Sequence, residues 1–266
     1  MNQQFNVAII GAGAMGGAVA KGLISSGYAP SHISVANPHE EKLDPFATAG
    51  CRVTTDNVAA ISEASLIIIA VKPWILHSVA AQIRGHIDCD TQQLALIVAG
   101  VSGEELKDMF AVGGRLPSMA VVMPNTAVAF CRSMTFIVEL AGECQPSQGL
   151  FSRLGGVMTI DERQLPAATA LASCGIAYAL RYIRAAVEGG VELGFKADVA
   201  QQIVAHTLEG AVALLAAPGA HPEAEIDKVT TPGGITIRGL NAMEAAGFTP
   251  AVIAGLRASV KSQSSL

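Results

Sequence analysis

Short apolar runs and helix-like patterns alternate along the first half of the chain. Apolar, strand-like runs predict strands at residues 5–10, 32–37, 51–54, 65–71, 94–100 and 115–123. Helical spacing predicts helices between them, at residues 15–27, 40–50, 57–64, 74–83 and 103–110. Strands that lack polar alternation are typical of sheets buried on both faces. The repeated order therefore predicts an α/β fold with a parallel sheet.

The pattern changes after about Asp161. Apolar residues recur near every third or fourth position over 165–193 and 196–217, which predicts two long helices and no further strand. We therefore expect a Rossmann-type dinucleotide-binding domain over 1–160 and an all-helical domain over 161–266. The wide apolar faces of the second domain favour packing against another subunit, although two such helices could also pack within one chain.

Composition narrows the function classes. Of the 266 residues, 51% are hydrophobic and 15% are charged, and the formal net charge is −5. A negative chain without a Lys/Arg run disfavours nucleic-acid binding. The best candidate for a membrane helix, residues 171–187, is interrupted by Arg181 and Arg184. The polar start at Met1–Asn6 is unlike a signal peptide, so we expect a cytoplasmic protein.

The cysteines and histidines show no metal or disulfide pattern. The five cysteines are scattered and form no CxxC pair, which predicts reduced thiols that mostly serve packing. No HExxH or DxDxDG motif is present, so no metal site is predicted.

A glycine-rich loop joins the first predicted strand to the first predicted helix. Gly11, Gly13 and Gly16 have the GxGxxG spacing. The first glycine allows a tight turn, the second lets the backbone approach a pyrophosphate, and the third packs the helix on the strand. The helix N-terminus adds N–H groups and a partial positive charge. The predicted cofactor-binding loop comprises Gly11, Ala12, Gly13, Ala14, Met15 and Gly16.

The end of the second predicted strand bears on the choice of dinucleotide. An NAD site usually has Asp or Glu there, which binds the ribose hydroxyls. Here the strand ends without an acid, and Asn37 could donate to a 2′-phosphate with His39 assisting. Glu40 and Glu41 would repel that phosphate if they faced it, and no arginine is present. The balance favours NADPH and leaves NADH open.

Two later loops are expected at the same edge of the sheet, AVKP (70–73) and AGV (99–101). Loops at the carboxyl ends of parallel strands line the ligand crevice. Lys72 is either beside the cofactor or solvated, and Asn57 either faces the crevice or caps its helix. The further predicted cofactor-binding residues are Asn37, Asn57, Ala70, Val71, Lys72, Pro73, Ala99 and Gly100.

Near the end of the chain, two glycines stand at the apparent start of a helix. Glycine costs a helix interior roughly 1 kcal/mol relative to alanine, so bare backbone there should serve a purpose. Thr231 is a good N-cap and Pro232 a good first helical residue. Gly233 and Gly234 would then present N–H groups to a small carboxylate, with the Thr236 hydroxyl in the first turn. The alternative is an ordinary capped helix with glycines for tight packing.

These motifs, taken in order, resemble the pyrroline-5-carboxylate reductase family. The resemblance rests on GAGAMG, AVKP, AGV, MPNT (123–126) and VTTPGGITIRGL (229–240), and it covers essentially the whole chain. It implies NAD(P)H-dependent reduction of 1-pyrroline-5-carboxylate to L-proline, the last step of proline biosynthesis. It also implies a helical domain that interleaves into a homodimer, sometimes assembled further.

The resemblance also implies roles for the turn before the last predicted helix. The substrate carboxylate is expected on this turn, and Thr236 near the ring nitrogen is the candidate catalytic residue. Because threonine is a poor acid, we expect it to orient the ring or to relay a proton from water. The implied substrate-binding residues are Thr231, Gly233, Gly234, Ile235 and Thr236.

Four residues depart from the family pattern. Ala14 replaces an asparagine of the glycine loop, and Ile176 replaces a proline before the long helix. Arg184 stands where an acid is frequent, and Ile235 stands where a small residue is usual. Ile235 would narrow the pocket beside the carboxylate. These departures bear on rate and substrate range more than on reaction class.

Two other functions fit parts of the sequence. A β-hydroxyacid-type dehydrogenase shares the two-domain plan, but it would need a catalytic lysine in the helical half. Lys196 and Lys228 do not lie in a GxxxK helix pattern. A non-catalytic NADP-binding regulator is suggested by Arg184 and Ile235. Oxidation of NADPH by pyrroline-5-carboxylate separates the three.

Overall fold

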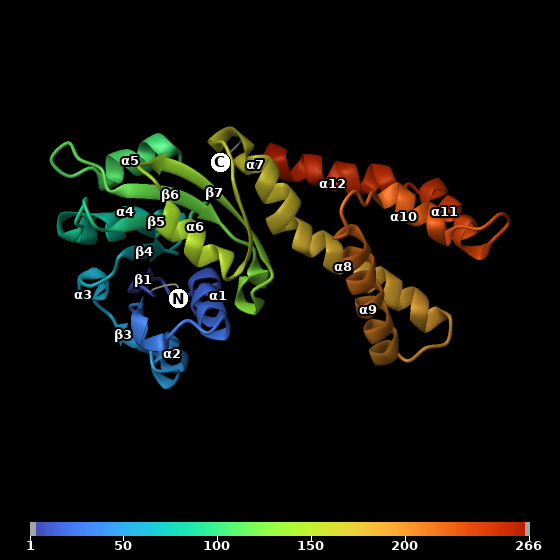
Figure 1. The fold of residues 1–266 in the computed structure, drawn as a ribbon, viewed down its shortest axis with the longest axis horizontal. Helices are drawn as coiled ribbons and strands as arrows, with labels where there is room; N and C mark the ends of the chain where they lie inside the picture. Colours follow the sequence, from blue (N-terminus) through green and yellow to red (C-terminus); the bar gives the residue numbers. More distant parts are fainter. Residues whose placement is uncertain (1–3, 264–266) are drawn as a thin grey trace. The chain divides into compact units, whose positions relative to one another are not determined.

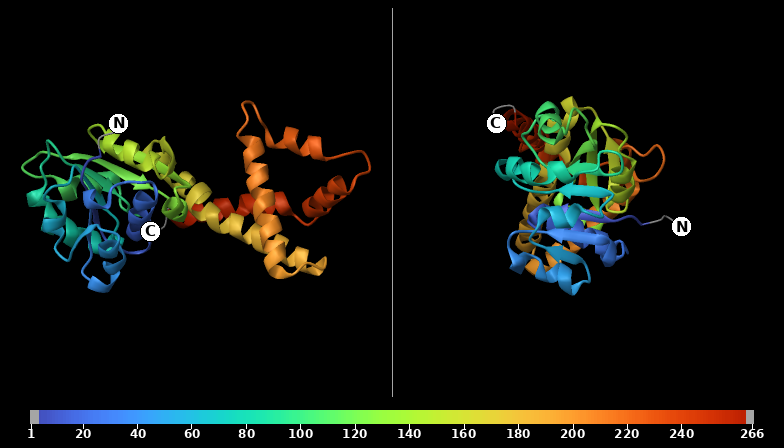
Figure 2. Two further views of the ribbon diagram at one scale, coloured as in Figure 1. Left: turned by 60° about the horizontal axis from the view of Figure 1, so that its bottom comes forward. Right: turned by 90° about the vertical axis from the view of Figure 1, so that its left-hand side faces the viewer.

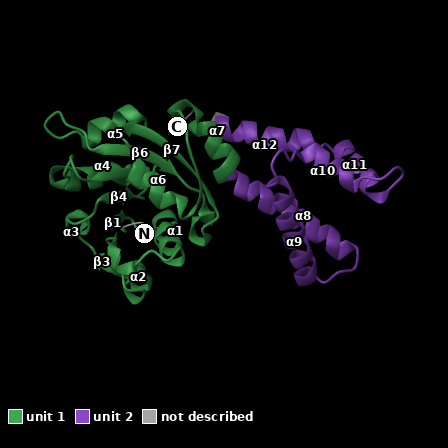
Figure 3. Ribbon diagram, in the orientation of Figure 1, with its two compact units in different colours: residues 1–173, 265–266 green, residues 174–264 purple. Residues whose placement is uncertain are grey.

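The computed structural model describes residues 4–263 and divides into two compact units (Figure 3). Unit 1 extends to Ser173, and unit 2 begins at Cys174. The division falls inside a long helical segment. It lies later in the chain than the domain boundary at 160/161 that the sequence pattern suggested.

Unit 1 is built on an eight-stranded sheet with the strand order β3-β2-β1-β4-β5-β6-β7-β8 (Figure 1). The first six of these strands in chain order run parallel, as predicted, and have the Rossmann arrangement. The strands are β1 (Val7–Ile10), β2 (Ile33–Ala36), β3 (Arg52–Thr54), β4 (Leu66–Ile69), β5 (Gln93–Leu96), β6 (Ser118–Met123), β7 (Ser133–Ala141) and β8 (Gly155–Thr159).

The last two strands were not predicted. β7 pairs antiparallel with β6, and β8 pairs parallel with β7, so the predicted parallel sheet is extended at this edge by two strands of opposite direction. Ser133 and Thr135 of β7 are buried, which masks the apolar run of a typical core strand. β8 begins with Gly155 and Gly156, residues that usually indicate a turn.

Helices cover both faces of this sheet (Figures 1 and 2). Val7 and Ile9 of β1 belong to one hydrophobic cluster, and Ala8 and Ile10 belong to the other. Successive strand residues point to opposite faces, so one apolar run supplies both cores. The first cluster includes α1 (Ala14–Ser25), α2 (Asp44–Thr48) and α6 (Gln145–Ser152), and the second includes α3 (Asn57–Ile61), α4 (Pro73–Ile83) and α5 (Gly103–Phe110).

Short helical turns connect several of these elements. The sequence pattern of residues 40–50 resolves into a 3₁₀ turn followed by α2, because Pro45, in the first turn of α2, has no N–H to continue the preceding turn. The 3₁₀ turns are η1 (Pro30–His32), η2 (Glu40–Lys42), η3 (Arg84–His86), η4 (Thr126–Phe130) and η5 (Glu162–Gln164).

The long helical stretch predicted over 165–193 is confirmed, with one irregularity. It starts as α7 (Leu165–Ala168), widens into the π-helical turn η6 (Thr169–Ser173) and continues as α8 (Cys174–Glu192). The π turn ends where unit 1 ends. A wide turn of this kind is rare and often occurs at functional sites.

Unit 2 is all helical, as predicted (Figure 3). Besides α8, its helices are α9 (Ala197–Leu215), α10 (Pro222–Val229), α11 (Ile235–Ala245) and α12 (Phe248–Gln263). α8 packs against α9, and the Tyr178 hydroxyl of α8 donates to the Gly255 carbonyl of α12 at 3.3 Å. Over residues 4–263, no helix is long and apolar enough to span a bilayer.

The helices of unit 2 leave most of their apolar side chains uncovered. Among its residues with described side chains, Ala200 alone is buried. Leu193 is 83% exposed and Val212 is 69% exposed. A stable unit needs a larger core than this, so these helices require a covering surface.

Gly22 is a packing point in unit 1. A Cβ at this position would lie 2.2 Å from the carbonyl oxygen of Val128 in η4, and a backbone atom cannot move aside as a flexible side chain can. We predict that Gly22→Ala lowers the free energy of unfolding by about 1–3 kcal/mol, measured by urea denaturation. Gly149→Ala in α6 is the control, because nothing lies within 4 Å of its Cβ. Equal losses in the two variants would contradict this packing.

Candidate active site

The glycine loop lies at the carboxyl edge of the parallel strands. Gly11 follows β1 with φ +100°, and its N–H donates to the Ala36 carbonyl at 2.8 Å. A Cβ on Gly11 would lie 2.6 Å from the Ala70 carbonyl oxygen. A Cβ on Gly16 would lie 1.9 Å from the Gly11 carbonyl oxygen. These two positions require glycine for steric reasons, as a tight turn and a closely packed helix do.

Gly13 differs from its two neighbouring motif glycines. A Cβ there would meet nothing within 4 Å, so packing within the protein does not require glycine. Gly13 is the N-cap of α1, which has no side-chain cap and no acid in its first turn. The first-turn N–H groups of Ala14 and Met15 therefore have no capping side chain, and the adjoining Gly13 position is open. This arrangement fits an anion such as a pyrophosphate.

The two later loops reach the same edge. The Ala70 N–H donates to the Ile10 carbonyl at 2.9 Å, which keeps the AVKP loop beside the glycine loop. Lys72 is exposed at the start of α4, and its Nζ lies 5.9 Å from the ring centre of Trp74. Ala99 and Gly100 are exposed beyond β5. The structure thus brings together residues 11–16, 70–73 and 99–100, which are remote in sequence.

Asn37 lies at the tip of β2 and is almost wholly buried. Its Oδ1 accepts the His39 N–H at 3.0 Å, so the amide group that remains for a ligand is a donor. The exposed His39 ring lies 3.7 Å from the Glu41 carboxylate. A hydrogen-bond donor at this position suits the oxygens of a 2′-phosphate, whereas free ribose hydroxyls are usually bound by an acceptor such as a carboxylate.

Asn57 does not cap α3. The N-cap is Asp56, whose Oδ1 accepts the Val58 and Ala59 N–H groups at 2.8 and 3.3 Å. Asn57 is the first helical residue, and its Nδ2 donates to the Gln82 Oε1 at 2.8 Å. The helix-cap alternative is therefore wrong.

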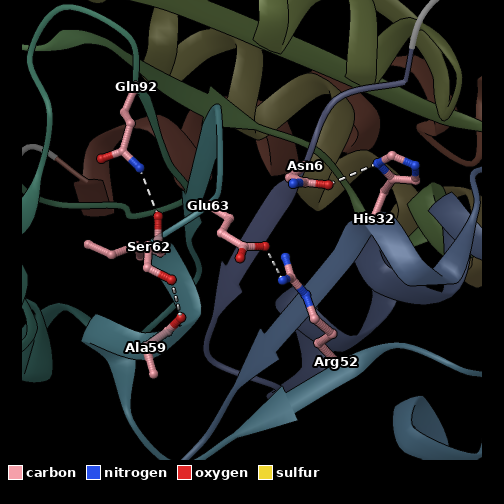
Figure 4. A network of polar contacts seen from close by, with 8 residues as sticks. Asn6, His32, Arg52, Ala59, Ser62, Glu63 and Gln92 are labelled. Atoms are coloured by element: carbon pink, nitrogen blue, oxygen red, sulfur yellow. Dashed lines mark hydrogen bonds and ion pairs between the residues drawn. The ribbon is translucent and has the colours of Figure 1, made fainter.

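The opposite edge of the sheet carries a polar network (Figure 4). Asn6 Oδ1 and His32 Nδ1 are 2.9 Å apart, just before β1 and β2. Arg52, the first residue of β3, pairs with Glu63. The buried Gln92 donates to the Ile61 and Ala64 carbonyls, each at 2.7 Å. These contacts satisfy polar groups at the starts of the strands, away from the glycine loop.

Two buried thiols are poor candidates for covalent catalysis. Burial raises the pKa of the Cys144 thiol to about 11, and the Glu139 carboxylate adds to this. Burial also raises the pKa of Cys51. Both thiols are protonated near neutral pH, whereas the thiolate is the nucleophile. All five cysteines are free of disulfides, and Cys51 and Cys144 are buried.

The TTPGG stretch forms a turn before the helix. The Gly234 N–H donates to the Thr231 carbonyl at 2.9 Å, and Gly233 has φ +71°. Proline followed by such a glycine is typical of a type II turn. The prediction that Thr231 caps the helix and Pro232 opens it is wrong, because α11 begins at Ile235 with Gly234 as its N-cap. The left-handed φ of Gly233 cannot continue into an α-helix.

The open helix N-terminus is nevertheless present. α11 has no side-chain cap and no acid in its first turn, so the N–H groups of Ile235, Thr236 and Ile237 lack helical partners. The φ of +71° at Gly233 favours glycine there, and a Cβ on Gly234 would lie 2.5 Å from the Thr231 Oγ1, so that hydroxyl would have to move. Ile235 is 86% exposed, and Thr236 is exposed beside it. Backbone donors and a hydroxyl at a helix start fit a small carboxylate.

Asn125 belongs to the MPNT motif (123–126) but was not among the predicted site residues. Asn125 lies two residues beyond the end of β6, so it is at the same carboxyl edge as the loops after β1, β4 and β5. It is 5% exposed. Its position just after the sixth predicted strand was the feature of the sequence that could have indicated a site residue.

The fold and the site define a class of protein. A Rossmann sheet with an open glycine loop, followed by a helical unit, is the plan of a nicotinamide-dinucleotide-dependent oxidoreductase. Residues 6–100 match the family model described as "NADP oxidoreductase coenzyme F420-dependent". Residues 162–266 match the family model described as "Pyrroline-5-carboxylate reductase dimerisation".

Individual relatives narrow this class. "Pyrroline-5-carboxylate reductase 2" of Dictyostelium discoideum is 34% identical over 97% of this chain and 92% of its own length. "Pyrroline-5-carboxylate reductase 1" of the same organism is 36% identical over 98% of this chain, which spans 49% of that protein. The structure of Plasmodium falciparum pyrroline carboxylate reductase with NADP bound has the same fold, with a TM-score of 0.86 at 23% identity, covering 98% of this chain and 97% of that one. The chain belongs to the pyrroline-5-carboxylate reductase family.

Gly13 gives a direct test of the cofactor edge. Gly13→Val places a branched side chain in open space, so the fold should persist while the approach of a pyrophosphate is blocked. We predict at least a tenfold loss of NADPH affinity in calorimetric titration, with an unchanged unfolding temperature. Gly13→Ala should show a smaller loss in the same direction. Unchanged NADPH affinity in Gly13→Val would remove the glycine loop from the binding site.

Proposed function

We propose that this protein is a pyrroline-5-carboxylate reductase, which reduces 1-pyrroline-5-carboxylate to L-proline with NADPH. The observation that carries the proposal is the similarity to named reductases along nearly the whole chain. Two open helix N-termini, at α1 and α11, supply what a dinucleotide and a small carboxylate need.

The residues of the carboxyl edge fit a dinucleotide. The loop 11–16 would hold the pyrophosphate, and the open space at the Gly13 Cβ position accommodates it. The Asn37 amide would donate to a 2′-phosphate, which favours NADPH, with NADH as a second cofactor. Lys72, Ala99 and Gly100 are further proposed contacts. When bound, the cofactor supplies a hydride.

The turn before α11 would bind the imine. The carboxylate of the imine would accept hydrogen bonds from the first-turn N–H groups and from the Thr236 hydroxyl. Reduction adds hydride to the imine carbon, the C=N electron pair moves to nitrogen, and nitrogen takes a proton. Thr236 would orient the ring or relay this proton from water, since its own hydroxyl is a poor acid. Much of the rate would come from orientation, where effective molarities reach about 10⁵ M or more.

The uncovered helices would form a homodimer. The apolar faces of 177–193 and 196–217 include several exposed side chains on α8 and α9, and residues 162–266 match a dimerisation family. Dimers of this kind could assemble further. We place the enzyme in the cytoplasm, and its five unpaired cysteines suit a reducing compartment.

Thr236 tests the proposed site and reaction together. NADPH absorbance should fall when pyrroline-5-carboxylate is added to the native protein, which a β-hydroxyacid dehydrogenase or a non-catalytic regulator would not show. Losing a hydrogen bond to a charged group costs roughly 1.5–3 kcal/mol, so Thr236→Ala should lower kcat/KM for the imine about ten- to a hundredfold. The KM for NADPH should change little.

Two variants serve as controls for this experiment. Thr236→Ser keeps the hydroxyl and should keep most of the activity. Thr249→Ala makes the same change in α12, where the hydroxyl bonds to Glu244, and should be nearly silent. If Thr236 also relays the proton, kcat should fall more than substrate affinity, and the pH–rate profile should lose a limb. Full kcat/KM in Thr236→Ala would assign the turn a purely structural role.

Assembly is tested by light scattering at micromolar concentration. We predict a dimer for the native protein and monomers for Leu180→Asp and Val212→Asp, because a carboxylate cannot be buried unpaired in an apolar interface. Met158→Asp in β8 changes an apolar side chain of unit 1 that is also more than half exposed, and this variant should remain dimeric. A monomeric native protein would refute the proposed dimer.

A further inference from the structure

Asn125 connects the end of β6 to a distant part of unit 1. Its N–H donates to the Ser133 Oγ at 3.1 Å, and its Oδ1 accepts the Ala127 N–H at 3.0 Å. Its Nδ2 donates to the carbonyl oxygen of Ala172 at 3.4 Å, across 47 residues of sequence. Both ends of this buried amide are therefore occupied.

The Ala172 carbonyl belongs to the π-helical turn η6. Within this turn, the Thr169 hydroxyl donates back to the Leu165 carbonyl at 2.7 Å, as threonine often does in a helix. The Ser173 Oγ is enclosed and has no protein partner among the described residues. The turn is thus not fully satisfied by its own hydrogen bonds. Asn125 gives it a contact from outside the helix.

A second contact anchors the start of the same segment. The Glu162 carboxylate accepts the Gly103 N–H at 2.7 Å, at the first residue of α5. Ser102 and Glu105 complete a capping box there. Residues 162–173 are therefore tied at both ends to loops that follow β5 and β6.

These anchors have a defined place in a Rossmann sheet. One mononucleotide half is formed by β1–β3 and the other by β4–β6. The glycine loop and Asn37 belong to the first half. Asn125 and Gly103 belong to the second half, close in sequence to the proposed contacts Ala99 and Gly100. A dinucleotide held by the glycine loop would extend its nicotinamide toward this second half.

We propose that Asn125 is a positioning residue for hydride transfer, which holds the π turn 169–173 in place at the nicotinamide end of the cofactor edge. The proposal rests on the proposed function. Asn125 acts through the Ala172 carbonyl and needs no contact with the reacting atoms. A displacement of about 1 Å can cost roughly a hundredfold in rate, whereas pyrophosphate and ribose contacts in the first half should persist.

Asn125→Asp isolates this contact. The carboxylate keeps the size of the side chain and the acceptor for the Ala127 N–H, but it places a charged acceptor against the Ala172 carbonyl. We expect kcat for the imine to fall tenfold or more, with the NADPH dissociation constant from calorimetric titration within threefold of the native value. Ser173→Ala removes an unpartnered hydroxyl from the same turn and should keep kcat within twofold.

Hydrogen exchange gives a readout that does not depend on turnover. Backbone amides of residues 169–176 should exchange faster in Asn125→Asp and at the native rate in Ser173→Ala, while those of α1 stay unchanged. If the native protein fails to reduce the imine, the proposed function fails, and exchange still tests the contact. If Asn125→Asp does not fold, Ser133→Ala removes the acceptor of the Asn125 N–H and should give a smaller loss of kcat.

Two outcomes would overturn the proposal. Native kcat together with native exchange in Asn125→Asp would show that the contact positions nothing. A parallel loss of NADPH affinity, kcat and unfolding temperature would show that Asn125 serves general stability.

Discussion

The close approach of α1 to the loops after β1 and β4 is the constraint on which the site depends. The Gly16 position lies against the Gly11 carbonyl, and Gly11 lies against Ala70, with no room for a Cβ at either glycine. This contact brings the N-terminus of α1 to the carboxyl edge of the sheet. Gly13, which has room around it, can then serve a ligand. Within this one motif, Gly11 and Gly16 are required by packing, whereas Gly13 is free to serve binding.

Each unit contains a helix whose N-terminus is left open, and the surrounding structure differs between the two. α1 and α11 both begin at a glycine N-cap without a side-chain cap or a first-turn acid. In α1 the glycine spacing follows from packing on a strand, whereas before α11 it follows from a type II turn. Each arrangement leaves helical N–H groups unsatisfied, which favours an anion. A dinucleotide pyrophosphate and an imine carboxylate are the anions that the proposed reaction requires.

Stability is distributed unevenly between the units. Unit 1 contains one apolar cluster on each face of its sheet, whereas Ala200 is the only buried residue among the described side chains of unit 2. The apolar surface of α8 and α9 is best explained by association, because burying each such side chain stabilises by roughly 1.5–3 kcal/mol. Assembly would then be part of folding for the helical unit, and its stability would depend on protein concentration.

The amino-acid sequence by itself determined the six parallel strands, the glycine loop and the long helices, because apolar periodicity and glycine spacing are local signals. Tertiary structure decided β7 and β8. In β7 the buried Thr135 donates to the Ser133 hydroxyl, which also accepts the Asn125 N–H from the loop after β6, and polar residues at such positions give no apolar periodicity. It also decided that Asn57 bonds Gln82 and that Asn125 reaches Ala172. Hydrogen bonds between residues far apart in the chain depend on where the whole fold places them, and no local pattern records that.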